Sequence, residues 1–145
     1  MTVYLLDVNV LLALCDSLHV HHEAAHRWFE EYGRTAWATC PITENGFVRI
    51  ASHPSYPNRP GDVIAVLAIL QRLCAVADHR FWMDELALRD ILLPGATLTH
   101  AQVTDVYLLG LAARKGGKLA TFDRHIPTAA VRNGEHCLEL IPGNP

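Results

Sequence analysis

Residues 99–126, THAQVTDVYLLGLAARKGGKLATFDRHI, decide the fold class of this chain. Thr99 and Gln102 have the spacing of a capping box, so we predict a helix that begins here and runs to about Lys115. The Gly-Gly pair that follows ends this helix, and we predict a strand at residues 118–121 directly after it. A helix that leads into a buried strand is typical of an α/β protein.

The rest of the chain alternates between strand and helix patterns in the same way, which predicts a mostly parallel sheet. We expect further strands at residues 3–6, 35–40, 80–83 and 137–141, and further helices at 8–15, 23–32, from Pro41, at 62–76 and at 84–93. Prolines and a glycine interrupt any regular element in His53–Gly61, which is predicted to be the main loop. The length of 145 residues fits one domain, which we place over 1–145.

The composition is that of a globular protein with a buried core. Half of the residues are hydrophobic, but no apolar run approaches the ~20 residues of a membrane span, so no membrane association is expected. The four cysteines form no C-x-x-C pair and lie in apolar segments, which favours reduced thiols in a cytoplasmic protein over disulfides or a zinc site. The net charge of −3 argues mildly against nucleic-acid binding by charge alone.

Four carboxylates lie beside apolar segments that ought to be buried. Asp7 and Asp123 follow predicted strands, and Glu44 and Asp105 lie in the first or second turns of predicted helices. Ligands of open parallel sheets bind outside the carboxyl ends of the strands, so all four acids are expected at one edge of the sheet. Four acids so close together would repel one another, and a divalent cation would remove that repulsion. Oxygen ligands suit Mg²⁺ or Mn²⁺, which usually act on phosphates.

Three blocks of sequence that contain these acids resemble the motifs of PIN-domain ribonucleases. They are LLDVNVLLAL at residues 5–14, ITENGFVRI at residues 42–50 and TDVYLLGLAARKGGKLATFDRHI at residues 104–126. The resemblance covers nearly the whole chain, and within that family the chain resembles the VapC toxins of VapBC toxin–antitoxin systems. It implies a PIN-like α/β/α sandwich with a central, mostly parallel sheet.

The same resemblance implies a metal-dependent endoribonuclease, with Mg²⁺ or Mn²⁺, that hydrolyses RNA with metal-activated water. Carried over by motif, Asp7, Asp105 and Asp123 are expected to be direct or water-mediated metal ligands. Glu44 is expected to be the fourth acid, as a metal ligand or as the group that positions the attacking water. The resemblance also implies a homodimer and a cognate VapB-type antitoxin whose C-terminal segment fills the acidic groove. The loop His53–Gly61, with its tyrosine and arginine, is a candidate for RNA selection.

Asn9 and Thr121 are candidates for groups that hold the acids in place. Asn9 lies two residues after Asp7 and could form a hydrogen bond with it. Thr121 lies two residues before Asp123 on a predicted strand, so the two side chains are expected on the same side. The sequence is equally compatible with a helix-capping asparagine and a threonine that merely favours a strand.

Three other interpretations stay open at this point. HEAAH at residues 22–26 fits the H-E-x-x-H signature of zinc proteases, with His22 and His26 as metal ligands and Glu23 as the base. Phosphatases of the haloacid-dehalogenase type also place an aspartate after the first strand, but they have a second aspartate where this chain has Asn9. The third is a PIN-like fold that binds partners without catalysis, although the complete set of acids disfavours it.

Overall fold

The computed structural model describes residues 1–144, and these form a five-stranded sheet in which every neighbouring pair is parallel. The strands are β1 (Tyr4–Leu6), β2 (Trp37–Thr39), β3 (His79–Phe81), β4 (Lys118–Thr121) and β5 (Leu138–Leu140). Their order is β3-β2-β1-β4-β5, and Leu5 of the central strand pairs with Ala38 and Leu119. The first strand in the sequence is therefore the middle one, and the residues that follow it lie at the centre of the sheet edge.

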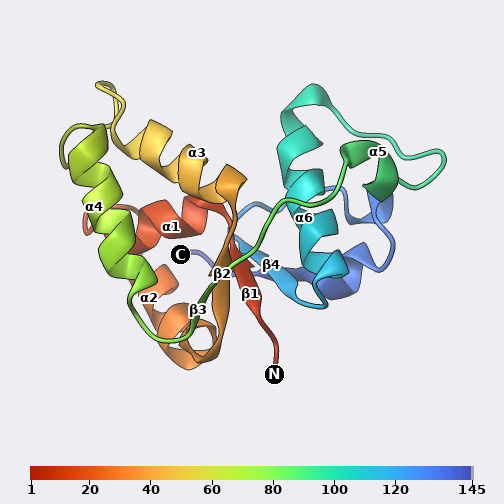
Figure 1. Cartoon of the computed structure of the whole chain (residues 1–145), viewed down its shortest axis with the longest axis horizontal. Coiled ribbons are helices and arrows are strands. Elements are labelled where there is room, and N and C mark those ends of the chain that lie inside the picture. Colours follow the sequence, from red (N-terminus) through yellow and green to blue (C-terminus); the bar gives the residue numbers. More distant parts are fainter. Residues whose placement is uncertain (145) are drawn as a thin grey trace.

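Helices cover both faces of this sheet and complete the predicted α/β/α sandwich (Figure 1). They are α1 (Val8–Cys15), α2 (His22–Glu31), α3 (Pro41–Ala51), α4 (Val63–Cys74), α5 (Leu88–Ile91) and α6 (Val103–Arg114). The core under α1 to α4 contains Leu6 and Trp37, whereas the core under α5 and α6 contains Leu5 and Leu119. Leu5 and Leu6 reach opposite cores because side chains alternate along a strand.

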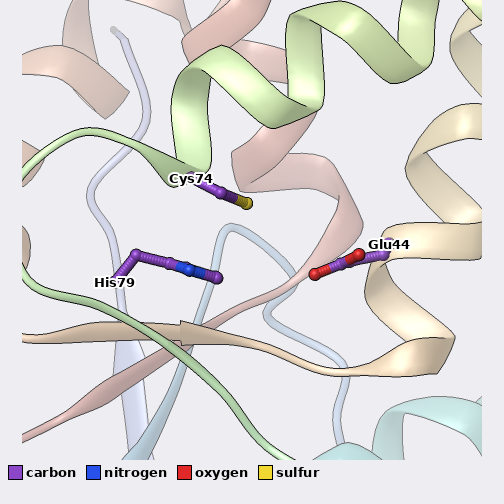
Figure 2. A group of neighbouring side chains, drawn as sticks. All are labelled: Glu44, Cys74 and His79. Atoms are coloured by element: carbon purple, nitrogen blue, oxygen red, sulfur yellow. The ribbon is translucent and has the colours of Figure 1, made fainter.

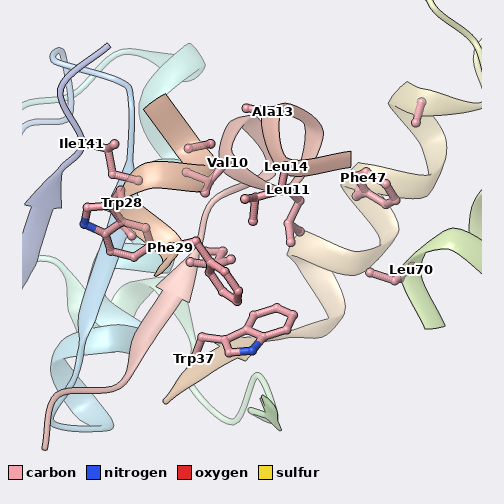
Figure 3. Packing of buried hydrophobic residues seen from close by; sticks show 14 of the residues in the cluster. Val10, Leu11, Ala13, Leu14, Trp28, Phe29, Trp37, Phe47, Leu70 and Ile141 are labelled. Carbon is pink, nitrogen blue, oxygen red and sulfur yellow. The ribbon is translucent and has the colours of Figure 1, made fainter. Parts of the chain in front are cut away.

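Aromatic residues fill part of the core under α1 to α4 (Figure 3). Phe29 of α2 meets Trp37 of β2 edge to face, with ring centroids 5.5 Å apart, and Trp28 meets Tyr4 in the same way at 5.0 Å. Such pairs contribute about 0.5–1.5 kcal/mol beyond the burial of their area. These two pairs hold α2 against strands β1 and β2.

Most of the predicted elements agree with the structure within one or two residues. The helix at 8–15 and the strand at 118–121 have the predicted bounds, and Pro41 begins α3 as expected. The capping box of Thr99 and Gln102 is present, but it begins a turn of 3-10 helix that precedes α6. Local signals were sufficient at these places because the caps and the apolar spacing agree with the tertiary packing.

The predicted helix at residues 84–93 was wrong over its first half. The helix begins only at Leu88. The segment before it is not helical and contacts α6 and the residue that follows α6. The Tyr107 hydroxyl donates a hydrogen bond to the Leu86 carbonyl at 2.9 Å, and Lys115 Nζ pairs with Glu85 at 2.9 Å. These tertiary contacts outweigh a weak local preference for helix.

The predicted strand at residues 35–40 was too long at its start. Thr35 belongs to a 3-10 turn, Gly33–Thr35, and β2 begins at Trp37. Gly33 lies so close to α2 that an added Cβ would be 2.8 Å from both Phe29 and Trp28. The chain must turn over these rings before it can enter the sheet.

No helix within residues 1–144 is long and apolar enough to cross a membrane. All four cysteines are free thiols, with Cys40 buried and the others half-buried. Burial raises the pKa of Cys15 to about 12 and that of Cys74 to about 11, with further contributions from nearby charges, so both are neutral thiols at neutral pH.

Candidate active site at the carboxyl edge of the sheet

Asp7 directly follows β1, is only 5% exposed and is held by two hydrogen bonds. Its Oδ1 accepts from the Val8 N–H at 2.8 Å, which caps α1, and its Oδ2 accepts from the Thr121 hydroxyl at 2.8 Å. Burial raises its pKa, while the hydrogen bonds from Thr121 and Val8 lower it and the charge of Asp123 raises it further. Asp7 therefore caps a helix and presents a carboxylate at the middle of the sheet edge at the same time.

Thr121, the last residue of β4, joins several groups around Asp7. Its hydroxyl donates to Asp7 and accepts from the Asn9 side-chain amide at 3.1 Å and from the Asp123 N–H at 3.0 Å. The side-chain carbonyl oxygen of Asn9, Oδ1, accepts a hydrogen bond from the Phe122 N–H at 3.2 Å. The expected hydrogen bond between Asn9 and Asp7 is absent from the described residues, because Asn9 bridges to β4 and reaches Asp7 only through Thr121.

Asp105 and Asp123 complete a group of three aspartates with Asp7. Asp105 lies in the first turn of α6, and Asp123 lies just beyond β4, where its Oδ1 accepts from the His125 N–H at 2.8 Å. Burial raises the pKa of Asp105 to about 6, and the negative charges of Asp7 and Asp123 contribute to the rise. Because the charges of Asp7 and Asp123 act on the pKa of Asp105, the fold gathers these three acids, far apart in sequence, into one group.

The three aspartates have no basic partner. Among residues 1–144 the ion pairs of lysine and arginine are Arg34–Glu30, Arg80–Asp78 and Lys115–Glu85, and none involves this group. Acids that repel one another without a counter-charge are either partly protonated or neutralised by a bound cation. A set of ligands made only of carboxylate oxygens fits Mg²⁺ or Mn²⁺ best.

Among the described residues, Glu44 forms no hydrogen bond with the three aspartates. It is in the first turn of α3, after β2, but its carboxylate accepts a hydrogen bond from the Thr39 hydroxyl and faces Cys74 and His79 (Figure 2). Its charge acts on the pKa of Cys74 and His79, whereas the charges that act on Asp105 come from the other aspartates. The structure thus places Glu44 with Thr39, Cys74 and His79, and a group of four acids stays a prediction. Nothing in the spacing of residues 44, 74 and 79 indicated this second group.

The histidines of HEAAH contact the end of α1. A ring nitrogen of His22 is 2.7 Å from the Ala13 carbonyl oxygen, and one of His26 is 2.9 Å from the Leu14 carbonyl oxygen. The last carbonyls of a helix have no partner within the helix, so both histidines act as caps for α1. Within residues 1–144, neither histidine belongs to a group of three histidine, cysteine or acidic side chains whose ligand atoms lie within 4.8 Å of one another. The zinc-protease interpretation therefore finds no support.

Tyr56 and Arg59 of the main loop form hydrogen bonds to other residues of the protein. The Tyr56 hydroxyl donates to Asp16 at 2.7 Å, and Arg59 Nε donates to the Ser52 carbonyl at 2.7 Å. Asp16 also accepts from the Asn58 side chain at 3.0 Å. These contacts give the loop a defined shape and fix the position of the Tyr56 hydroxyl.

Comparison with known proteins places this chain in a family. A family model described as the PIN domain matches residues 4–131. Ribonuclease VapC39 of Mycobacterium tuberculosis is 44% identical over 133 residues, which cover 87% of this chain and 92% of that protein. Ribonuclease VapC44 of the same organism is 43% identical over 129 residues, which cover 88% of this chain and 90% of that protein.

Solved structures agree in fold. Mycobacterium tuberculosis VapC20, a toxin that cleaves the sarcin–ricin loop, superimposes with a TM-score of 0.60 at 13% identity and covers 89% of this chain and 96% of its own. VapBC2 of Rickettsia felis, bound to a DNA fragment from its promoter, gives a TM-score of 0.59 at 9% identity, with 97% and 100% coverage. At such low identities the likeness concerns the fold alone.

Proposed function

Given that this chain belongs to the PIN-domain family and to its VapC ribonucleases, we propose that Asp7, Asp105 and Asp123 bind Mg²⁺ or Mn²⁺ and that the cation enables cleavage of RNA. The chain is the endoribonuclease toxin of a VapBC-type toxin–antitoxin pair. One observation carries the metal proposal: three carboxylates without a basic partner meet at the carboxyl edge of a parallel sheet.

The residues around the cation would act mainly by holding oxygen atoms in place. The bound cation supplies a Lewis acid and a water of lowered pKa for attack on the scissile phosphate. Asp7 is fixed by Val8 and Thr121, so one buried carboxylate oxygen is set before any ligand arrives. Glu44 is proposed as the fourth acid, which joins the group when its side chain turns away from Thr39.

The first test is cleavage of total RNA by the purified chain with Mg²⁺, with Mn²⁺ and with a chelator. We expect new RNA ends, mapped by sequencing, with either cation and none with the chelator. Cleavage that continues at full rate in the chelator would contradict a role for the metal. Absence of any new ends with a folded protein and both cations would contradict the nuclease itself.

An antitoxin and a second copy of the chain are the proposed partners. Two structural neighbours are VapBC proteins, from Rickettsia felis and Salmonella typhimurium, which supports a VapB-type antitoxin here.

The exposed face of α4 carries apolar side chains at Val63, Ile64 and Leu67, of which Ile64 is 72% exposed, and this supports burial against another copy. We expect the purified chain to have the mass of a dimer in light scattering at micromolar concentration, and a monomer there would count against the homodimer.

A further inference from the structure

A second group of side chains of metal-binding types consists of Glu44, Cys74 and His79 (Figure 2). Glu44 comes from the first turn of α3, Cys74 is the last residue of α4 and His79 is the first residue of β3. All three side chains are half-buried and point toward a common space, and one ligand atom of each lies within 4.8 Å of the others. Three separate elements thus converge on one point with a carboxylate, a thiol and an imidazole.

The negative charge of Glu44 is not balanced by a basic side chain. Its carboxylate accepts a hydrogen bond from the Thr39 hydroxyl, whose oxygen is also 2.8 Å from a ring nitrogen of His79. None of the ion pairs within residues 1–144 includes Glu44 or His79. A half-buried carboxylate without a counter-charge is costly to maintain, and a bound cation would remove this cost.

The ligand atoms select a different cation from the one proposed for the aspartates. Thiolate and imidazole are preferred by Zn²⁺ and poorly suited to Mg²⁺. Zinc binds sulfur at about 2.3 Å and nitrogen at about 2.0 Å, so ligand atoms around one ion lie roughly 3–4 Å apart. The three ligand atoms, which lie within 4.8 Å of one another, need to close by no more than about 1–2 Å, and a fourth position would remain for water.

We propose that Glu44, Cys74 and His79 form a binding site for Zn²⁺, and that zinc bound there inhibits RNA cleavage. The inhibition rests on the proposed function, in which Glu44 is the fourth acid of the nuclease. When the Glu44 carboxylate binds zinc together with Cys74 and His79, it cannot bind a second cation together with the three aspartates. The zinc site itself requires no nuclease activity.

Binding is tested without RNA, by titrating the metal-free, reduced chain with Co²⁺ as a spectroscopic substitute for Zn²⁺. We expect a thiolate-to-cobalt charge-transfer absorption that saturates at one equivalent and is removed by added Zn²⁺. The band should be lost in Cys74→Ser and weakened in His79→Gln. It should persist in Cys137→Ser, a half-buried thiol on the other face of the sheet, and in Cys15→Ser, whose thiol lies near Cys74. A wild-type chain without this band, or a Cys74→Ser chain that keeps it, would overturn the site.

Inhibition is tested by adding Zn²⁺, at the concentration that removes the cobalt band, to Mg²⁺-dependent RNA cleavage. We expect the wild-type rate to fall at least about tenfold, the usual scale for disturbing a group that supports a metal site. Cys74→Ser should cleave with Mg²⁺ and keep its rate when zinc is added. Equal inhibition of both proteins would overturn the regulatory role. If the wild type cuts no RNA with Mg²⁺, the proposed function and the inhibition both fail, while the cobalt spectrum alone still decides the metal site.

Discussion

Asp105→Asn is expected to lower the rate of RNA cleavage by on the order of 10³-fold without unfolding the protein, which is the scale seen when a charge-stabilising group is removed from an active site. Asp105 lies at the start of α6 beside Asp7 and Asp123, and a neutral amide holds a divalent cation poorly. The measurement is the single-turnover cleavage rate at saturating Mg²⁺. A matched control is Asp90→Asn, an exposed acid in the first turn of α5, which should cleave at the wild-type rate. Wild-type activity in Asp105→Asn would remove this residue from the mechanism.

The same variant should be more stable than the wild type in the absence of metal, by a margin that grows between about pH 4 and pH 6 and is complete above about pH 6. The folded-state pKa of Asp105 is raised to about 6, above the ~3.9 of an unfolded chain. The folded wild type therefore binds more protons than the unfolded chain between these values, and its stability falls as the pH rises through this window. Because Asp105 is half-exposed, the cost above the window is only about 1–2 kcal/mol after allowing for solvent screening. Asparagine removes this cost.

Thermal unfolding in a chelator tests this stability difference. The melting temperature of Asp105→Asn should exceed that of the wild type at about pH 8, and the two should be nearly equal at about pH 4. Mg²⁺ should raise the melting temperature of the wild type more than that of the variant. A large drop for the variant at the higher pH would mean that Asp105 stabilises the fold.

Thr121→Val is expected to lower the cleavage rate about 10–100-fold, as for other groups that orient metal ligands. Valine preserves the shape but removes a hydroxyl that is completely buried and contacts Asp7, Asn9 and the Asp123 N–H. That hydroxyl also lowers the pKa of Asp7 against the effect of burial. The free energy of unfolding should fall by about 1–3 kcal/mol, because buried donors lose their partner.

The matched variant for this position is Thr121→Ser, which retains the hydroxyl. It should keep most of the activity, whereas Thr121→Val should also need a higher Mg²⁺ concentration for half-maximal cleavage. A merely structural role would lower stability in both variants without this change in metal requirement. Equal Mg²⁺ requirements in all three proteins would exclude Thr121 as the group that positions Asp7.

The elements that were predicted well are those whose signals are local. The helix at residues 8–15 and the strand at 118–121 depend on apolar spacing, on Asp7 as a cap and on glycines after α6. The segment before Leu88 was predicted poorly because contacts with α6, some twenty residues or more along the chain, decide its shape. Local preference for helix amounts to less than about 1 kcal/mol per residue and is easily outweighed.

In the candidate site, too, the positions of the acids in the chain could be predicted, whereas some of their side-chain contacts could not. The positions of Asp7 and Asp123 after strands, and of Asp105 at a helix start, were readable because parallel strands share one carboxyl edge. The contacts of their neighbours were not readable: Asn9 reaches Thr121 instead of Asp7, and Glu44 faces Cys74 and His79. Each of these contacts joins segments that are far apart in the chain.

The sequence by itself determined the α/β class, the order of its elements and the strand and helix ends at which the acids lie. These follow from periodicity, capping and chain punctuation, which act over a few residues. Only the tertiary structure decided that His22 and His26 cap α1 and that Glu44 joins a thiol and an imidazole. The physical reason is that such contacts join segments far apart in the chain, and packing sets their relative positions to within an ångström, which no local pattern encodes.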